Sequence, residues 1–322
     1  MMLRDAPLEQ LRAYRGGVDL PADFMDFWRA TLAESRAQGW APRLEPVSTP
    51  LATIDVWDLT FAGFGGEPIK GWLRAPRGLA GPAPGIVSYA GYGGGRGLAT
   101  ENLLWASAGF AHLQMDSRGQ GSSWSAGATP DAGATGPAVP GRCTFGIGDK
   151  ATYYYRRLFA DAVLAVDAAR ALPQVDAGRV GVAGTSQGGA MALAAACLAE
   201  SVRAAFAAVP FLADIRRGAE TTDARPFSEF AEYLACHRDQ VDAVFAVLAY
   251  FDGVNFARLA QAPIRMTAAL MDEVVPPATV FAAYNNYAGP KSLRVWEFNG
   301  HESGGPLDDS DALAFLTAQL RS

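Results

Sequence analysis

The segment that decides the fold is Val180-Gly181-Val182-Ala183-Gly184-Thr185-Ser186-Gln187-Gly188-Gly189. Its apolar start predicts a buried strand, and the alanine-rich run after Gly188 predicts a helix. Between them stands the pattern Gly-x-Ser-x-Gly, which makes a sharp strand-to-helix turn and leaves the serine hydroxyl accessible. A serine that only caps the helix is the alternative interpretation. The flanking strand and helix favour Ser186 as a nucleophile at the carboxyl end of a sheet.

Strand-like and helix-like segments alternate along the chain on both sides of this turn. The expected strands are 54–64, 69–74, 86–89, 110–115, 180–183, 204–209, 264–270 and 293–298. The expected helices are 102–108, 153–171, 188–200 and 277–287. The later strands are short and almost wholly apolar, which indicates a mostly parallel central sheet with helices on both faces. We therefore expect the α/β fold class, with residues 1–322 in a single domain.

Three segments depart from this alternation. Residues 1–45 predict an N-terminal helical extension, because large apolar side chains recur there at helical spacing. The residues of that apolar face are Phe24, Phe27, Trp28 and Leu32. Residues 122–149 are rich in Gly, Ala and Pro without periodicity, which predicts a long loop. Residues 213–255 predict a helical insertion between two strands, in a position that suits a lid.

Composition limits the classes of partner. The chain has 322 residues, of which half are apolar, and a net charge of −6. It contains no block of Lys or Arg, so neither nucleic acid nor an anionic membrane is an expected partner. Three cysteines without a Cys-x-x-Cys spacing argue against a disulfide framework or a structural zinc site. Residues 1–7 lack the apolar core of a signal peptide, and we expect a cytoplasmic protein.

A serine hydroxyl needs an adjacent base in order to react near neutral pH, and the chain offers three histidines. His112 lies within an apolar strand, where packing is its expected role. His237 lies in the inserted helical region. His301 follows the last strand, on a loop that can reach back over the sheet. Because an imidazole exchanges its proton near neutral pH, His301 is the predicted base.

The base in turn needs an acid that fixes its tautomer. Asp272 begins the loop after strand 264–270, at the same end of the sheet. Glu273, one residue along, is its rival. Asp308 and Asp309 come after the histidine, whereas the expected order along the chain is Ser, Asp, His. The predicted triad is Ser186, Asp272 and His301.

A tetrahedral intermediate requires two hydrogen-bond donors aimed at its oxygen. The backbone N–H of Gln187, directly after the nucleophile, is the first predicted donor. The second is the N–H of Tyr92 in the loop 90–97, Ala-Gly-Tyr-Gly-Gly-Gly-Arg-Gly. A phosphate-binding loop is the rival interpretation of these glycines, but no Gly-Lys-Ser/Thr ending follows them.

Together these motifs resemble carbohydrate esterase family seven, the acetyl xylan esterases and cephalosporin C deacetylases of the α/β-hydrolase superfamily. The resemblance covers nearly the whole chain. The matching motifs are Gly91-Tyr92 with Arg96-Gly97, Arg118-Gly119-Gln120-Gly121, 152–157, Gly184-Thr185-Ser186-Gln187-Gly188-Gly189, 209–212, 250–256, 276–291 and Gly300-His301-Glu302. The Arg-Gly-Gln-Gly and His-Glu signatures, joined to the Ser-Gln-Gly turn, are specific to that family.

The resemblance implies the same triad and the same oxyanion donors, Tyr92 and Gln187. It implies a serine esterase that deacetylates small acetylated xylo-oligosaccharides and cephalosporin C through an acetyl-enzyme on Ser186, with no cofactor. It also implies an intracellular homo-oligomer, typically a hexamer, in which the loop 122–149 takes part in subunit contacts.

Two positions depart from the family pattern: Ala90 replaces the usual histidine, and Val275 replaces the usual cysteine. Both lie near the expected acyl pocket, whose predicted walls are Tyr92, Pro210 and Val275, and they leave acyl and leaving-group preference open. Arg118 is predicted to pair with a carboxylate and fix a turn. Two alternatives remain: another small-substrate serine hydrolase, such as a short-chain esterase, lactonase or peptidase, and a catalytically silent scaffold.

Overall fold

The structure, a computed structural model, describes residues 5–131 and 141–321. Its strands form one nine-stranded sheet in the order β1-β2-β3-β5-β4-β6-β7-β8-β9. The strands are β1 (Arg43–Val47), β2 (Ile54–Ala62), β3 (Pro68–Pro76), β4 (Ala83–Tyr89), β5 (Ala111–Met115), β6 (Val175–Thr185), β7 (Val202–Ala208), β8 (Ile264–Ala269) and β9 (Lys291–Trp296). The strands expected from the sequence are all present, within a few residues of their expected ends.

The pairing of the strands changes from antiparallel to parallel across the sheet. Strands β1, β2, β3 and β5 pair antiparallel, and the strands from β5 through β4 to β9 pair parallel. β2 alternates buried and half-buried residues, whereas β4 and β7 are buried almost throughout, as expected for strands covered on both faces. The expectation of a mostly parallel sheet is confirmed, and its central strands carry their carboxyl ends to one edge.

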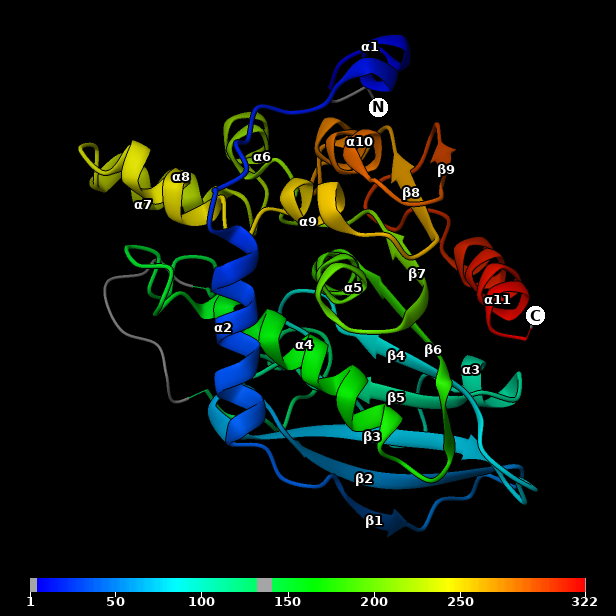
Figure 1. The fold of residues 1–322 in the computed structure, drawn as a ribbon. Helices are drawn as coiled ribbons and strands as arrows, with labels where there is room; N and C mark the ends of the chain where they lie inside the picture. Colours follow the sequence, from blue (N-terminus) through cyan, green and yellow to red (C-terminus); the bar gives the residue numbers. More distant parts are fainter. Residues whose placement is uncertain (1–4, 132–140, 322) are drawn as a thin grey trace.

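Helices cover both faces of the sheet (Figure 1). They are α1 (Leu8–Ala13), α2 (Phe24–Ala37), the short 3₁₀ turn η1 (Phe64–Gly66), α3 (Leu104–Ser107), α4 (Tyr154–Arg170), α5 (Gln187–Leu198), α6 (Ile215–Thr221), α7 (Ser228–Cys236), α8 (Val241–Leu248), α9 (Gly253–Leu259), α10 (Pro277–Asn286) and α11 (Pro306–Leu320). The large apolar core lies between the sheet and helices α4, α5, α9 and α10. A smaller core lies on the other face, under α3 and α11.

The N-terminal extension packs on the large core through the apolar face of α2, which lies beside α4 in Figure 1. Trp28 is fully buried there, and its ring contacts Phe159, Phe251 and Phe256 at centroid separations of 5.6–6.2 Å. Phe24 and Leu32 are buried beside it, and Phe27 is half-buried. The extension is therefore part of the folded core, because its aromatic face is buried in the core cluster.

Two elements were not anticipated from the sequence. β1 begins at Arg43, inside the segment 1–45 that was expected to be helical, and is a largely exposed edge strand that contains Pro46. An exposed edge has no apolar alternation to signal it. α11 was missed because its first turn is polar, although Pro306 at its start and the spacing of Ala312, Leu316 and Leu320 are helix signals.

Within 122–131 and 141–149 there is no helix or strand, and residues 132–140 of this predicted loop lie outside the described residues. The insertion 213–255 contains α6, α7 and α8, and α9 extends beyond its end. Among the residues described, none of the helices is both long enough and apolar enough to span a bilayer.

Candidate active site

Ser186 stands between β6 and α5 with φ +58° and ψ −120°, a conformation that L-residues rarely adopt. The glycines on either side are required by close backbone packing. A Cβ on Gly184 would lie 2.2 Å from the Gly188 carbonyl oxygen, and a Cβ on Gly188 would lie 2.3 Å from that of Tyr89. The turn therefore forms only with glycine at both positions, and it directs the serine hydroxyl above the sheet.

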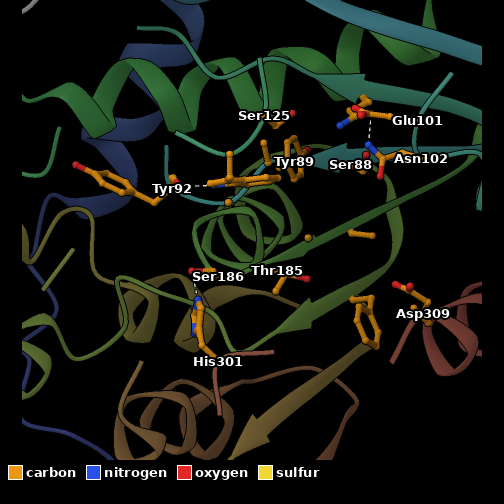
Figure 2. A pocket seen from close by; sticks show the side chains of 18 of the residues that line it. Ser88, Tyr89, Tyr92, Glu101, Asn102, Ser125, Thr185, Ser186, His301 and Asp309 are labelled. Atoms are coloured by element: carbon orange, nitrogen blue, oxygen red, sulfur yellow. Dashed lines mark hydrogen bonds between the residues drawn. The ribbon is translucent and has the colours of Figure 1, made fainter. Parts of the chain in front are cut away.

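The three residues of the predicted triad meet at the carboxyl edge of the sheet. His301 Nε2 lies 3.1 Å from Ser186 Oγ, and His301 Nδ1 lies 2.9 Å from Asp272 Oδ2. Figure 2 shows the imidazole of His301 directed at the hydroxyl of Ser186. With its proton on Nδ1, the ring donates to Asp272 and can accept the serine proton at Nε2.

Asp272 is held by its own loop. It is 1% exposed, and its Oδ1 accepts the backbone N–H groups of Val274 and Val275 at 2.8 and 2.9 Å. Its other oxygen faces the histidine. The rival Glu273 is exposed, and Asp308 accepts from Trp296 Nε1 and the Gly304 N–H. Asp272 is therefore the carboxylate that pairs with His301.

The other two histidines have structural surroundings. His112 is 1% exposed, and its Nε2 lies 2.7 Å from Ser88 Oγ. Burial, with a further contribution from the charge of Arg74, lowers the pKa of His112 to about 3. His237 stacks on Tyr233 at a centroid separation of 4.3 Å. Ser88 and His112 thus form a second serine–histidine contact, but with a very weak base.

The side chain of Gln120 connects the two loops that carry the predicted oxyanion donors. Its Oε1 accepts the N–H of Gly93 at 2.7 Å, and its Nε2 donates to Gln187 Oε1 at 2.9 Å and to Tyr154 at 2.8 Å. Within the described part of the chain, the backbone N–H groups of Tyr92 and Gln187 donate to no protein acceptor. Sequence reasoning placed Gln120 in a motif but gave it no role, because its partners are distant in sequence.

The side chain of Tyr92 extends away from Ser186 (Figure 2). Its hydroxyl donates to Glu229 Oε1 at 2.8 Å and accepts the N–H of Arg142. Glu229 is 1% exposed and also accepts the N–H of Cys143, and burial raises the pKa of its carboxyl group. Tyr92 therefore ties its loop to α7 and to the end of the segment 122–149. Nothing in the sequence signals this contact.

A cavity of about 870 Å³ opens beside the triad, with Ser186, His301 and Tyr92 in its lining. Pro210 and Val275, the other two predicted walls, do not line it. Pro210 packs against α5, where its Cα lies 3.1 Å from the Cβ position of Gly189, and Val275 is 1% exposed. Val274 lines the cavity instead. The side chains of consecutive loop residues point in different directions, and sequence alone does not say which one faces the cavity.

Arg118 is buried outside the cavity and has the predicted structural role. Its guanidinium donates to both oxygens of Asp161 and to Glu67. Among residues 5–131 and 141–321, no group of three or more His, Cys, Asp or Glu side chains has an arrangement that could hold a metal ion.

Comparison with known proteins agrees with this geometry. The family model of the acetyl xylan esterases (AXE1) matches residues 1–319. The structure is similar to that of an acetyl xylan esterase from Paenibacillus sp. R4, with a TM-score of 0.92 and 38% identity, over 98% of this chain and 100% of that one. It is also similar to acetyl xylan esterase 1 from a Thermoanaerobacterium species, with a TM-score of 0.90 and 32% identity, over 98% of this chain and 99% of that one.

A curated relative is more distant. The acetyl esterase Axe7A of Xylanibacter ruminicola is 28% identical over 294 residues, which are 87% of this chain. The match spans 63% of the length of that relative.

Proposed function

The chain belongs to the acetyl xylan esterase (AXE1) family, and from that membership we propose that it is a serine esterase that removes acetyl groups from small carbohydrate esters, in particular acetylated xylo-oligosaccharides. The observation that carries the proposal is the hydrogen-bonded series Ser186–His301–Asp272 at the wall of a cavity. Both solved structures named above are described as acetyl xylan esterases.

The proposed reaction begins when Ser186 Oγ attacks the carbonyl carbon of the acetyl ester and passes its proton to His301 Nε2. The N–H groups of Tyr92 and Gln187 stabilise the negative oxygen of the tetrahedral intermediate. The bond to the sugar oxygen then breaks, and His301 returns the proton to that oxygen. Throughout, Asp272 holds the imidazole and balances its positive charge.

The acetyl-enzyme left on Ser186 is then hydrolysed. A water molecule gives its proton to His301 as its oxygen attacks the acetyl carbonyl, and collapse of the second intermediate releases acetate and restores the serine hydroxyl. The same two loop amides serve both intermediates, because the carbonyl oxygen occupies the same place in each.

Cephalosporin C is proposed as a second substrate, on the strength of the family resemblance stated above. We also propose a homo-oligomer, with the hexamer of that family as its form, and an intracellular location. Sedimentation analysis of the purified protein tests the hexamer, and a mass of one or two chains would contradict it.

The first experiment compares hydrolysis of nitrophenyl acetate, butyrate and octanoate by the wild type and two variants. We expect preference for acetate and loss of activity in Ser186→Ala. The matched control is Ser88→Ala, which removes the other hydroxyl that lines the cavity and contacts a histidine. Because the pKa of His112 is about 3, Ser88→Ala should remain active. Full activity in Ser186→Ala, or loss of activity only in Ser88→Ala, would contradict the proposal.

A fluorophosphonate label separates the esterase from a silent scaffold. We expect Ser186 of the folded protein to be labelled and the Ser186→Ala variant to be unlabelled. Absence of labelling in the wild type would favour a scaffold. Preference for octanoate, or rapid hydrolysis of lactones or amides, would favour one of the other serine hydrolases.

A further inference from the structure

The cavity wall includes an exposed aromatic side chain to which the mechanism gives no role. Trp124 is 65% exposed and lines the same cavity as Ser186 and His301. The other large apolar side chains that are exposed among the described residues, such as Phe298 and Leu98, do not line it. An exposed indole in a reaction cavity has a large apolar surface available for a ligand.

Trp124 is fixed in place although it is exposed. Its Nε1 donates to the carbonyl oxygen of Tyr92 at 2.8 Å. Its ring also lies against the glycines of the loop 90–97, because a Cβ on Gly94 would be only 2.2 Å from Trp124 Cζ2. A ring held in this way loses little conformational freedom when a ligand binds to it.

The ring also lies close to the nucleophile. The Cβ position of Gly91 is 3.4 Å from Trp124 Cζ2 and 3.7 Å from the carbonyl oxygen of Thr185, the residue before Ser186. One glycine therefore separates the indole from the turn that carries the serine. A leaving group bonded to an acyl carbon on Ser186 would be within reach of this ring.

Polar groups line the same cavity and complement the ring. Ser125, Glu101 and Asn102 are among them, and Figure 2 shows these three together on the side of the cavity away from His301. Asn102 is oriented by a hydrogen bond from its Nδ2 to Gln114 Oε1 at 3.0 Å. A pyranose ring combines an apolar C–H face with hydroxyl groups at its edge, so an indole beside hydroxyl, amide and carboxylate groups matches its chemistry.

We propose that Trp124 is a stacking platform for the sugar ring that carries the acetyl group, and that it selects carbohydrate esters over other acetyl esters. The proposal rests on the function proposed above and adds the residue that recognises the leaving group. A platform stabilises the bound sugar before and during the reaction, so its loss should raise KM much more than it lowers kcat.

The test compares a monoacetylated methyl β-xyloside with ethyl acetate, whose leaving group has no ring. For Trp124→Ala we expect KM for the xyloside to rise about tenfold, the size of one stacking contact, while kcat and all constants for ethyl acetate stay within about twofold. Trp124→Phe should recover most of the affinity. Trp40→Ala is the matched control, because Trp40 also donates its Nε1 to a backbone carbonyl, that of Gly66, and lines a different cavity.

Equal losses for both esters would overturn the proposal, since Trp124 would then only hold the Tyr92 loop. Unchanged constants for the xyloside would also overturn it. A change of oligomeric mass in Trp124→Ala, measured by sedimentation, would instead make Trp124 a subunit contact and overturn the platform. If the wild type hydrolyses ethyl acetate but not the xyloside, the proposed function itself fails, and the wild-type data alone distinguish that outcome.

Discussion

Asp272 divides its two oxygens between two tasks: one accepts the amides of its own loop and the other faces His301. The hydrogen bonds from the loop amides fix the orientation of the carboxylate independently of its contact with His301. A carboxamide at this position would keep its oxygen on the loop amides and turn its NH₂ group toward the imidazole. The proton of the imidazole would then move to Nε2, where it blocks acceptance from Ser186.

We therefore expect Asp272→Asn to lower kcat by about 10⁴-fold, the size typical of this replacement in a serine triad. The matched control is Glu273→Gln, one residue along and exposed, which should keep activity within about twofold of the wild type. Steady-state hydrolysis of nitrophenyl acetate measures both. Comparable losses in the two variants would contradict the assignment of Asp272 as the acidic partner of His301.

The sequence predicts the position of a site residue well where that residue follows the end of a strand. Ser186, Asp272 and His301 each come directly after a strand or the next turn, so their meeting at one edge of the sheet follows from the topology. The partners of Tyr92 could not be predicted, because Glu229 lies 137 positions away and is brought close only by the packing of α7. Pro210 and Val275 were placed on the pocket wall from motif proximity, which gives no side-chain direction.

Among the elements, the glycine-rich loop and the turn before α5 depend on one amide side chain. Gln120 accepts from Gly93 in the first and donates to Gln187 in the second. Both proposed oxyanion donors stand next to these contacts. The relative position of the two donors therefore depends on a residue that does not itself touch the substrate.

We expect Gln120→Met to lower kcat by about tenfold to a hundredfold, less than the 10²–10³ typical of removing one oxyanion donor outright. KM should change little, since the residue positions donors that act in the transition state. Gln261→Met is the control, because Gln261 is exposed and precedes β8, at the edge of the sheet opposite the triad. A rise in KM with an unchanged kcat would show that Gln120 shapes the binding site instead.

Helix α2 packs on the large core through an aromatic contact region around Trp28. Trp28→Ala should lower the free energy of unfolding by about 3–5 kcal/mol, the range for deleting a buried large aromatic side chain. Phe298→Ala is the control, since Phe298 is 75% exposed, and its effect should stay within about 0.5 kcal/mol. Urea denaturation of the three proteins measures the difference. A small effect at Trp28 would mean that α2 is dispensable for the core.

The elements that the sequence predicted well are those with a strong apolar signal: β4 and α5 are nearly continuous apolar runs, and α4 is a long amphipathic helix. β1 and α11 were missed for opposite reasons. β1 is an edge strand with few buried residues, so its pairing with β2 is decided by backbone hydrogen bonds that leave little trace in composition. α11 buries Ala312, Leu316 and Leu320 at four-residue spacing, but its polar residues conceal this period.

For the whole molecule, the buried imidazole of His112 couples stability to pH. Its pKa is about 3 in the folded protein, whereas a histidine in an unfolded chain titrates near pH 6.5. Between these values the unfolded chain binds a proton that the folded protein does not. The free energy of unfolding should therefore fall as pH decreases from about 6.5 toward 3.

His112→Gln should reduce the slope of that loss, because it removes the buried group that titrates differently in the folded and unfolded chains. Urea unfolding at a series of pH values between about 4 and 7 gives the slopes. If the free energy of unfolding depended on pH equally in the wild type and in His112→Gln, this histidine would not be the source of the acid destabilisation.

The left-handed conformation of Ser186 has a consequence for how this sequence can evolve. A non-glycine residue in such a conformation costs about 1–3 kcal/mol, and the rest of the fold must compensate for it. Selection for activity therefore keeps the molecule below the stability that its own backbone would allow. In a lineage that no longer hydrolyses esters, this restraint disappears, and we expect glycine to replace the serine there first, as a mark of lost function.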